Sequence, residues 1–331
     1  MEQSAPVLRI DGLRVDFRMR GRTNRAVDGV SFALNKGEIL CIVGESGSGK
    51  SVTALSIMGL LNVPPAEIVS GEILYKGMDL LKCGEKEMRQ IRGGQIAMIF
   101  QEPMTSLNPL YPVGKQIAEA IRLHKHVNAK EAQTLAVELL KKVGIPSPER
   151  RIHDYPHQMS GGMLQRVMIA MALSCGGQVL IADEPTTALD VTIQAQILDL
   201  IAGLKEESMS ILLITHDLGV VAEMADNVIV MYMGQIMEKA RVDELFDSPA
   251  HPYTEGLLKS IPRLGQNEER LHVIPGSISD DAPEKGCRFY PRCEYATEKC
   301  AVSVPPLFRL AKGRLSRCWL RENEGVAEDE Q

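Results

Sequence analysis

The sequence predicts an α/β fold with a mainly parallel sheet, a helical insertion and a small cysteine-rich end. Apolar runs of strand length alternate with helical segments along much of the chain, an order typical of parallel sheets. A glycine-rich phosphate-binding motif joins one of these strands to the helix after it. Four of the seven cysteines gather between residues 287 and 318. With 331 residues, the chain is long enough for about two domains.

The N-terminal part is expected to be rich in strands. Alternating apolar and polar residues predict strands at Val7–Asp11 and Leu13–Phe17, followed by a hairpin turn within residues 18–25. The apolar run at residues 37–44 predicts a third strand. A helical pattern then runs from Lys50 to about Leu61, and the prolines at positions 64 and 65 stop it.

Residues 103–158 are predicted to be a helical insertion, with helices at Gln116–His124 and Ala129–Val143. Around it, strands and helices alternate: strand Ile96–Phe100, helix Met163–Leu173, strand Val179–Asp183, helix Thr192–Lys205, strand Ser210–Thr215, helix Leu218–Ala225 and strand Asn227–Met231. From about residue 245, frequent prolines predict little regular structure. We expect a domain at 1–240, with a helical subdomain at about 103–165, and an accessory domain at 241–331.

Composition excludes several classes of protein. No apolar run approaches the roughly 18 residues of a membrane-spanning helix. A net charge of −6 disfavours nucleic-acid binding. The N-terminus lacks the basic start and apolar core of a secretion signal, so we expect a reducing compartment in which disulfides are rare.

Residues 44–51 carry the strongest motif, a P-loop that fits G-x-x-x-x-G-K-[ST] between a predicted strand and a predicted helix. Its backbone N–H groups and the helix N-terminus favour phosphate, Lys50 is expected on the β- and γ-phosphates of ATP, and the Ser51 hydroxyl on Mg²⁺. A chance glycine–serine loop is the alternative. The residues expected to bind nucleotide here are Gly44, Glu45, Ser46, Gly47, Ser48, Gly49, Lys50 and Ser51.

A second motif follows a buried strand that ends in two carboxylates, Asp183 and Glu184. Unpaired buried charges are costly, so packing alone explains this pattern poorly. In a P-loop enzyme, Asp183 is expected to hold Mg²⁺, and Glu184 to act as the general base toward water. Ser160, Gly161 and Gly162 precede a helix and form a second candidate anion site, with an ordinary N-cap as the alternative.

In combination, these motifs resemble the nucleotide-binding subunits of ATP-binding cassette (ABC) transporters over about residues 7–240. The resemblance implies a P-loop NTPase cassette, with a RecA-like core, an antiparallel β subdomain and a helical subdomain. Ser160-Gly-Gly162 resembles the signature that completes a partner subunit's ATP site, with Met159 and Met163 in place of the usual Leu and Gln. The resemblance further implies adenine stacking by Phe17 (a core Phe is the alternative), a Q-loop glutamine at Gln101 that senses Mg²⁺, a D-loop ending at Asp190 and a switch histidine at His216.

Three stretches resemble the oligopeptide/dipeptide subgroup of this family, at residues 101–109, 155–163 and 251–262, and so does the C-terminal cysteine-rich segment with Pro291-Arg-Cys293. The resemblance implies an ATPase at the cytoplasmic face of the inner membrane. Its implied partners are two integral permease subunits, a second ATP-binding subunit (a paralogue or a copy) and, indirectly, an extracytoplasmic substrate-binding protein. Peptides are the expected cargo, with nickel or another small solute as the alternative. A soluble ABC ATPase or a regulator without turnover is a weaker reading.

The cysteines divide into two sets. Cys41, Cys83 and Cys175 are widely spaced and are expected to be ordinary residues. Cys287, Cys293, Cys300 and Cys318 lack the short C-x₂₋₄-C spacing usual for zinc, whereas iron–sulfur clusters accept varied spacings. The adjoining Arg288, Arg292 and Arg317 are expected to offset thiolate charge. The subgroup resemblance suggests a [4Fe–4S] cluster; zinc or unrelated thiols are the alternatives, and a structural role is preferred to a redox one.

Overall fold

The computed structural model describes residues 5–19, 21–206, 208–261, 273–276, 283 and 285–328. Pro262, the end of one subgroup stretch, lies outside these residues. The backbone divides into two compact units. The first comprises residues 1–7, 34–38 and 79–214, and the second comprises residues 8–33, 39–78 and 215–331. Among the described helices, none has the length and apolar character needed to cross a bilayer.

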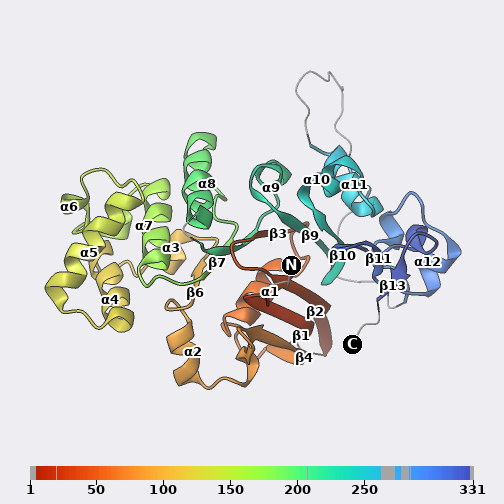
Figure 1. Cartoon of the computed structure of the whole chain (residues 1–331), viewed down its shortest axis with the longest axis horizontal. Coiled ribbons are helices and arrows are strands. Elements are labelled where there is room, and N and C mark those ends of the chain that lie inside the picture. The colour runs from red at the N-terminus through yellow and green to blue at the C-terminus, as the bar shows by residue number, and fades with distance from the viewer. Residues whose placement is uncertain are drawn as a thin grey trace. The chain divides into compact units, whose positions relative to one another are not determined.

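The first unit contains a parallel sheet with the strand order β6 (Ile96–Ile99), β7 (Val179–Asp183) and β8 (Ser210–Ile214). Every residue of these strands is buried. Strands covered on both faces have near-continuous apolar sequences, which is why they could be recognised from the sequence. The helices α2 (Glu85–Ile91), α7 (Gly161–Leu173) and α8 (Val191–Glu206) belong to the same unit (Figure 1).

The region expected to be a helical insertion is helical in the structure. It comprises α3 (Pro103–Ser106), α4 (Val113–Lys125), α5 (Ala129–Lys142) and α6 (Pro148–Arg151), followed by a 3₁₀ turn at Pro156–Gln158. Asn128 is the N-cap of helix α5: its side chain accepts from the Glu131 N–H (3.0 Å), while the Glu131 carboxylate accepts from the Asn128 N–H (3.1 Å). In α4, a Cβ at Gly114 would overlap Ile152, so only glycine permits this close approach.

In the second unit, one sheet contains β2 (Arg22–Leu34), β1 (Leu8–Met19) and β4 (Ala66–Tyr75), in that order. Strands β1 and β4 are antiparallel, and the register shifts between Asp11 and Val15. The two strands expected before residue 18 are therefore one strand with an irregularity, because Gly12 has a φ of +56° and interrupts the alternation. The short β5 (Met78–Asp79) follows, and a 3₁₀ turn (Leu80–Lys82) leads into α2.

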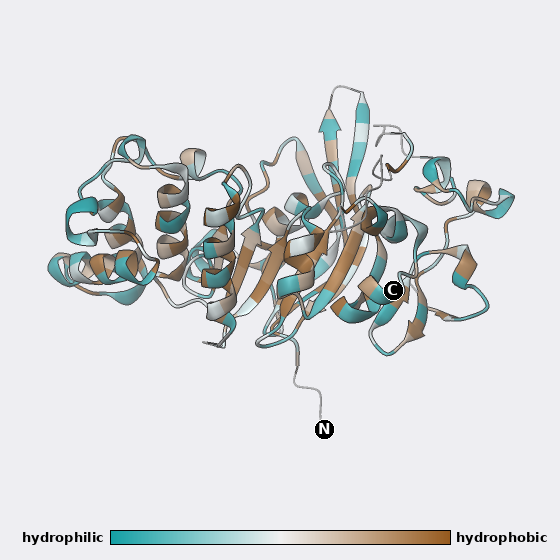
Figure 2. Cartoon of the chain, turned by 90° about the horizontal axis from the view of Figure 1, so that it is seen from above, coloured by the Kyte–Doolittle hydropathy of each residue, from teal (hydrophilic) through white to brown (hydrophobic). Residues whose placement is uncertain are grey.

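The other sheet of the second unit has the order β3 (Ile39–Val43), β9 (Asn227–Tyr232), β10 (Gln235–Arg241), β12 (Arg314–Ser316), β11 (Phe308–Ala311) and β13 (Val326–Ala327). Strands β3 and β9 are parallel, and the pairs from β9 onward are antiparallel. The central strands carry mostly hydrophobic residues (Figure 2). Helix α1 (Lys50–Ile57) follows β3, and helix α9 (Leu218–Met224) precedes β9.

The expectation of little regular structure after residue 245 is wrong. The helices α10 (Val242–Asp247), α11 (Pro252–Lys259) and α12 (Glu298–Val302) lie there, with strands β11 to β13 and 3₁₀ turns at Tyr290–Arg292 and Trp319–Arg321. Each of these strands is too short for its own alternation to be visible in the sequence. They form because β12 extends β10, with Glu238 opposite Ser316.

Helix α1 ends four residues earlier than expected. The Leu60 N–H donates to the Leu55 carbonyl (2.9 Å) and the Gly59 N–H to the Ser56 carbonyl (3.0 Å), while Gly59 has a φ of +59°. These bonds around a left-handed glycine form a Schellman cap, so the glycine ends the helix before the prolines do.

Candidate ATP-binding site and cysteine cavity

The P-loop lies between β3 and α1, as the motif predicts. Gly44 and Gly49 have φ values of +151° and +100°. A Cβ at Gly44 would overlap the Met231 carbonyl, and one at Gly49 would lie 2.5 Å from the Ala26 carbonyl oxygen. Glycine is therefore required at both positions by backbone conformation and by close packing.

Lys50 begins helix α1 and is 5% exposed. Its Nζ donates to the carbonyls of Gly44 (2.8 Å) and Glu45 (3.0 Å) and to the Ser48 hydroxyl (3.3 Å). The loop is thus curled around the ammonium group. Ser51 follows in the first helical turn, next to the N-terminal N–H groups that favour anions.

Glu45 in this loop is held by Tyr253, which the sequence does not single out, and by Arg292, which the sequence assigns to the cysteines. Its N–H donates to the Tyr253 hydroxyl (3.0 Å), and its carboxylate accepts two hydrogen bonds from the Arg292 guanidinium (2.7 and 3.1 Å). This pairing with Glu45 raises the pKa of Arg292. The presence of arginines next to cysteines was a visible signal, but sequence spacing does not reveal their partners.

Asp183 is the last residue of strand β7 in the first unit and is 5% exposed, and Glu184 follows it directly. The Glu184 Oε2 accepts hydrogen bonds from Gln101 Nε2 (2.9 Å) and from the Thr187 hydroxyl (2.9 Å). Gln101 and Glu184 are 83 positions apart in the sequence, and the fold brings them together. The glutamine and the predicted base are therefore in direct contact.

Ser160, Gly161 and Gly162 line a cavity of about 490 Å³ together with Ala188, Leu189 and Asp190. Ser160 is also the N-cap of α7, since its hydroxyl accepts from the Met163 N–H (3.4 Å). A Cβ at Gly162 would lie 2.7 Å from Ile193 Cγ2. Asp190 Oδ1 accepts from the Ile193 N–H (3.0 Å) and orients the start of α8. The structure thus joins the two motifs at one open cavity.

The other predicted nucleotide contacts lie in the second unit. Phe17 is in β1 opposite Ala66 and is half-buried. His216 is exposed and lies two residues after the end of β8 in the chain. The next residue, Asp217, begins α9 by accepting from the Gly219 N–H (2.8 Å).

All four clustered cysteines, Cys287, Cys293, Cys300 and Cys318, line one cavity of about 220 Å³. Burial raises the pKa of Cys287 and of Cys318 to about 11, and it also raises the pKa of Cys293. Within the part of the chain that the structure describes, no group of three or more His, Cys, Asp or Glu side chains is arranged to hold a metal ion. Of the remaining cysteines, Cys41 is fully buried in β3.

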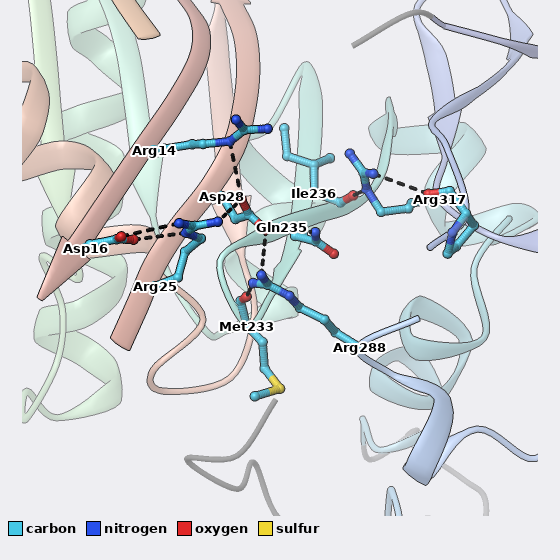
Figure 3. A network of polar contacts seen from close by, with 10 residues as sticks. Arg14, Asp16, Arg25, Asp28, Met233, Gln235, Ile236, Arg288 and Arg317 are labelled. Atoms are coloured by element: carbon cyan, nitrogen blue, oxygen red, sulfur yellow. Dashed lines mark hydrogen bonds and ion pairs between the residues drawn. The ribbon is translucent and has the colours of Figure 1, made fainter. Parts of the chain in front are cut away.

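The arginines that adjoin these cysteines in the sequence form ion pairs and hydrogen bonds with other residues. Arg288 pairs with Asp28 (2.5 Å) and donates to the Met233 carbonyl, and Arg317 Nε donates to the Ile236 carbonyl (3.1 Å). Figure 3 shows this network, in which Arg14 and Arg25 also approach Asp28. The expectation that Arg288 and Arg292 offset thiolate charge is therefore wrong, because their guanidinium groups are bound to Asp28 and Glu45.

Comparison with known proteins shows which families the chain is similar to. Residues 27–187 match the family described as "ABC transporter", and residues 237–300 match "Oligopeptide/dipeptide transporter, C-terminal region". The chain is 52% identical to the oligopeptide transport ATP-binding protein AppD of Bacillus subtilis, over 97% of this chain and 98% of the relative. It is 53% identical to a putative peptide import ATP-binding protein of Brucella melitensis, over 95% and 96%.

Solved structures show the same cassette fold. A dimeric post-hydrolysis ATP-binding cassette, MJ0796 bound to ADP and Pi, has a TM-score of 0.64 and 26% identity, covering 71% of this chain and 98% of the other. CbiO1 of Clostridium perfringens, part of the transporter complex cbiONQ, has a TM-score of 0.62 and 26% identity, with coverages of 74% and 92%. The chain therefore belongs to the ATPase subunits of the ABC transporter family, in the group with the oligopeptide/dipeptide C-terminal region.

Proposed function

We propose that this chain hydrolyses ATP to power peptide import, with Glu184 as the general base. The observation that carries the assignment of the base is the contact between Gln101 Nε2 and Glu184 Oε2 (2.9 Å). A glutamine amide that donates to the carboxylate fixes its orientation and links it to the helical insertion, which begins two residues later at Pro103. Glu184 then accepts a proton from the attacking water.

The other predicted residues bind different parts of ATP and its Mg²⁺ ion. Lys50 binds the β- and γ-phosphates, Phe17 stacks on adenine, and His216 contacts the γ-phosphate. Ser51, Asp183 and Gln101 offer oxygen ligands, which suit Mg²⁺. When bound, Mg²⁺ neutralises phosphate charge. Peptides remain the preferred cargo over nickel or another small solute, because the curated relatives are named for peptide transport.

The cavity lined by Ser160, Gly161 and Gly162 supports the proposal of a second ATP-binding subunit. Ser160, Gly161 and Gly162 present a helix N-terminus at an open cavity of about 490 Å³, beside Asp190. Such an N-terminus favours phosphate. We propose that it completes the ATP site of a partner cassette, which is a paralogue or a copy, so that ATP closes the dimer and hydrolysis opens it.

The helical insertion is the proposed contact with two integral permease subunits at the cytoplasmic face of the membrane. Met104, Leu110 and Tyr111 are 60%, 77% and 43% exposed, and they follow Gln101 closely in the chain. Exposed apolar side chains gathered in this way mark interaction surfaces. Co-purification of the tagged chain from membranes tests this role: integral permeases are expected, and a soluble ABC ATPase would recover none.

Replacement of Glu184 by Gln tests the proposed base. The amide cannot accept the proton, so ATP hydrolysis is expected to fall by about 100-fold or more while ATP binding persists. ATP should then be trapped, and the cassette dimer should be visible by size-exclusion chromatography. Glu138→Gln, at an exposed position of α5, is the matched control. Hydrolysis at the wild-type rate by Glu184→Gln would show that another residue is the base.

For residues 241–331 we propose an accessory role in which the four clustered cysteines hold a [4Fe–4S] cluster. Their shared cavity of about 220 Å³ is large for a single ion, and four thiolates are the usual ligands of such a cluster. The cluster, when bound, supplies positive charge that stabilises buried thiolates. Zn²⁺ is the alternative occupant. A structural role is favoured, since the segment has short elements and few core residues of its own.

Metal analysis of anaerobically purified full-length protein tests this proposal. We expect iron and acid-labile sulfide in equal amounts, with absorbance near 400 nm, and their loss in Cys318→Ser. Cys175→Ser, outside the set, should keep both. Zinc without sulfide would identify the alternative, and the absence of any metal would leave the four residues as unrelated thiols.

A further inference from the structure

Residues in the C-terminal part of the chain bind the phosphate-binding loop. Arg292 lies 247 positions after Glu45 and binds its carboxylate through two nitrogens, while Tyr253 accepts from the Glu45 N–H. Both the side chain and the backbone of one loop residue are thus bound by residues beyond position 240. None of the motifs that bind nucleotide accounts for these contacts.

These contacts have the features of a strong interaction. The Arg292 side chain is 7% exposed and that of Glu45 is 30% exposed, so water competes weakly for the pair. A two-pronged hydrogen-bonded guanidinium–carboxylate pair is stronger than a neutral hydrogen bond and is directional. Arg292 is itself fixed, because its Nε donates to the Pro275 carbonyl (2.8 Å). Its guanidinium also lies 5.7 Å from the centre of the Tyr232 ring.

Tyr253 is equally constrained. It is fully buried, and its ring lies 4.8 Å from that of Tyr232 and 5.2 Å from that of Phe289. Helix α11 carries Tyr253 in its first turn, and His251 Nδ1 accepts from the Tyr253 N–H (3.0 Å) at the start of that helix. The hydroxyl that receives the Glu45 N–H is therefore held by rigid packing.

Glu45 connects this support to the phosphate-binding lysine. The Glu45 carbonyl accepts from Lys50 Nζ (3.0 Å), so one residue contacts the C-terminal part through its N–H and carboxylate, and Lys50 through its carbonyl. We propose that Arg292 and Tyr253 are positioning residues for ATP: they hold Glu45, and through it the P-loop and Lys50, in the phosphate-binding conformation. Loss of either residue lets the loop sample other conformations, and ATP must then restore the binding one.

The proposal predicts weaker ATP binding without a matching loss of turnover. For full-length Arg292→Ala we expect the Kd and the KM for ATP to rise about tenfold, since a hydrogen-bonded pair of charges is lost. The kcat at saturating ATP should stay near the wild-type value. Arg292→Lys keeps the charge and should recover part of the affinity. Arg309→Ala removes an exposed arginine that pairs with Glu328 in the same region, and it should leave both constants unchanged.

A double-mutant cycle separates positioning from general stability. Glu45→Ala and Arg292→Ala should each weaken ATP binding, and the double variant should be no weaker than the worse single one. Tyr253→Phe removes one hydroxyl, keeps the ring packed and should weaken ATP binding by a smaller factor, which provides a readout if Arg292→Ala does not fold. Wild-type or tighter ATP binding by the variants, with only a lower melting temperature, would overturn the proposal. Failure of the wild-type protein to bind ATP would instead refute the proposed function.

Discussion

Glu184 shows how strain at a single residue marks the candidate catalytic centre. Its φ is +46°, in the left-handed region that non-glycine residues rarely adopt. The conformation is held by the Glu184 N–H, which donates to the Ile214 carbonyl (2.9 Å), and by side-chain bonds from Gln101 and Thr187. Ala188, with a φ of +63°, follows four residues later. Such strain gathers at functional sites, where the surrounding structure maintains it.

Glu238 leads to a prediction about pH. It is fully buried in β10, and its carboxylate accepts from the N–H groups of Ala250 (2.7 Å) and His251 (2.9 Å). Burial raises its pKa above the ordinary value of 4.5, and the backbone donors oppose this shift only in part. Between the unfolded and folded pKa values the folded protein binds more protons, so stability falls as pH rises through that window.

We therefore expect the melting temperature of the wild type to fall more steeply from pH 4.5 toward neutral pH than that of Glu238→Gln, which does not titrate. Calorimetry at a series of pH values measures the difference in slope. The change of melting temperature with pH is the relevant quantity. The amide in Glu238→Gln has only one acceptor oxygen, so the variant loses one of the two contacts and is less stable at every pH. Glu298→Gln, at an exposed position, should follow the wild type. Parallel curves for Glu238→Gln and the wild type would contradict the prediction.

At the scale of elements, a cap marks where helix α5 of the insertion begins. In α5, Asn128 and Glu131 exchange hydrogen bonds of 3.0 and 3.1 Å, which is a capping box. Periodicity predicts a helix from Ala129, and the structure confirms this start. By contrast, the end of α1 depended on a left-handed glycine that periodicity does not show.

Asn128→Ala should destabilise the start of α5 by about 1 kcal/mol, because the Glu131 N–H loses its side-chain acceptor. Hydrogen exchange is expected to rise in the first turn of α5 and to stay unchanged in α7. Gln133→Ala, an exposed substitution in the same helix, is the control and should alter exchange little. Equal protection in both variants would mean that packing alone holds the helix start.

At the scale of the whole molecule, the cysteine cavity and the P-loop depend on the same short segment of the second unit. Arg292 directly precedes Cys293, and Phe289 lines the cysteine cavity while its ring lies 5.4 Å from Tyr232 and 5.2 Å from Tyr253. The residues that position Glu45 are therefore continuous with the wall of the cavity. A substitution in the wall of the cysteine cavity is therefore expected to alter ATP binding.

Cys293→Ser should accordingly raise the Kd for ATP, by less than Arg292→Ala does, because the turn at Tyr290–Arg292 is loosened but Arg292 remains. Isothermal titration of the full-length protein measures the effect, with the metal content recorded for each sample. Cys83→Ser, in the first unit, provides the control. An unchanged Kd in Cys293→Ser would show that the cavity and the loop are independent.

The sequence by itself determined the α/β class, the helical insertion and the nucleotide motifs, because each rests on local patterns. Buried parallel strands are continuous apolar runs, and a P-loop is a contiguous motif. Only the tertiary structure decided the contact of Gln101 with Glu184 and the short strands after residue 300. It also decided that Arg288 and Arg292 pair with distant carboxylates and not with the neighbouring cysteines. These features join residues far apart in the chain, and no local pattern encodes which distant carboxylate an arginine binds or which strand a three-residue segment extends.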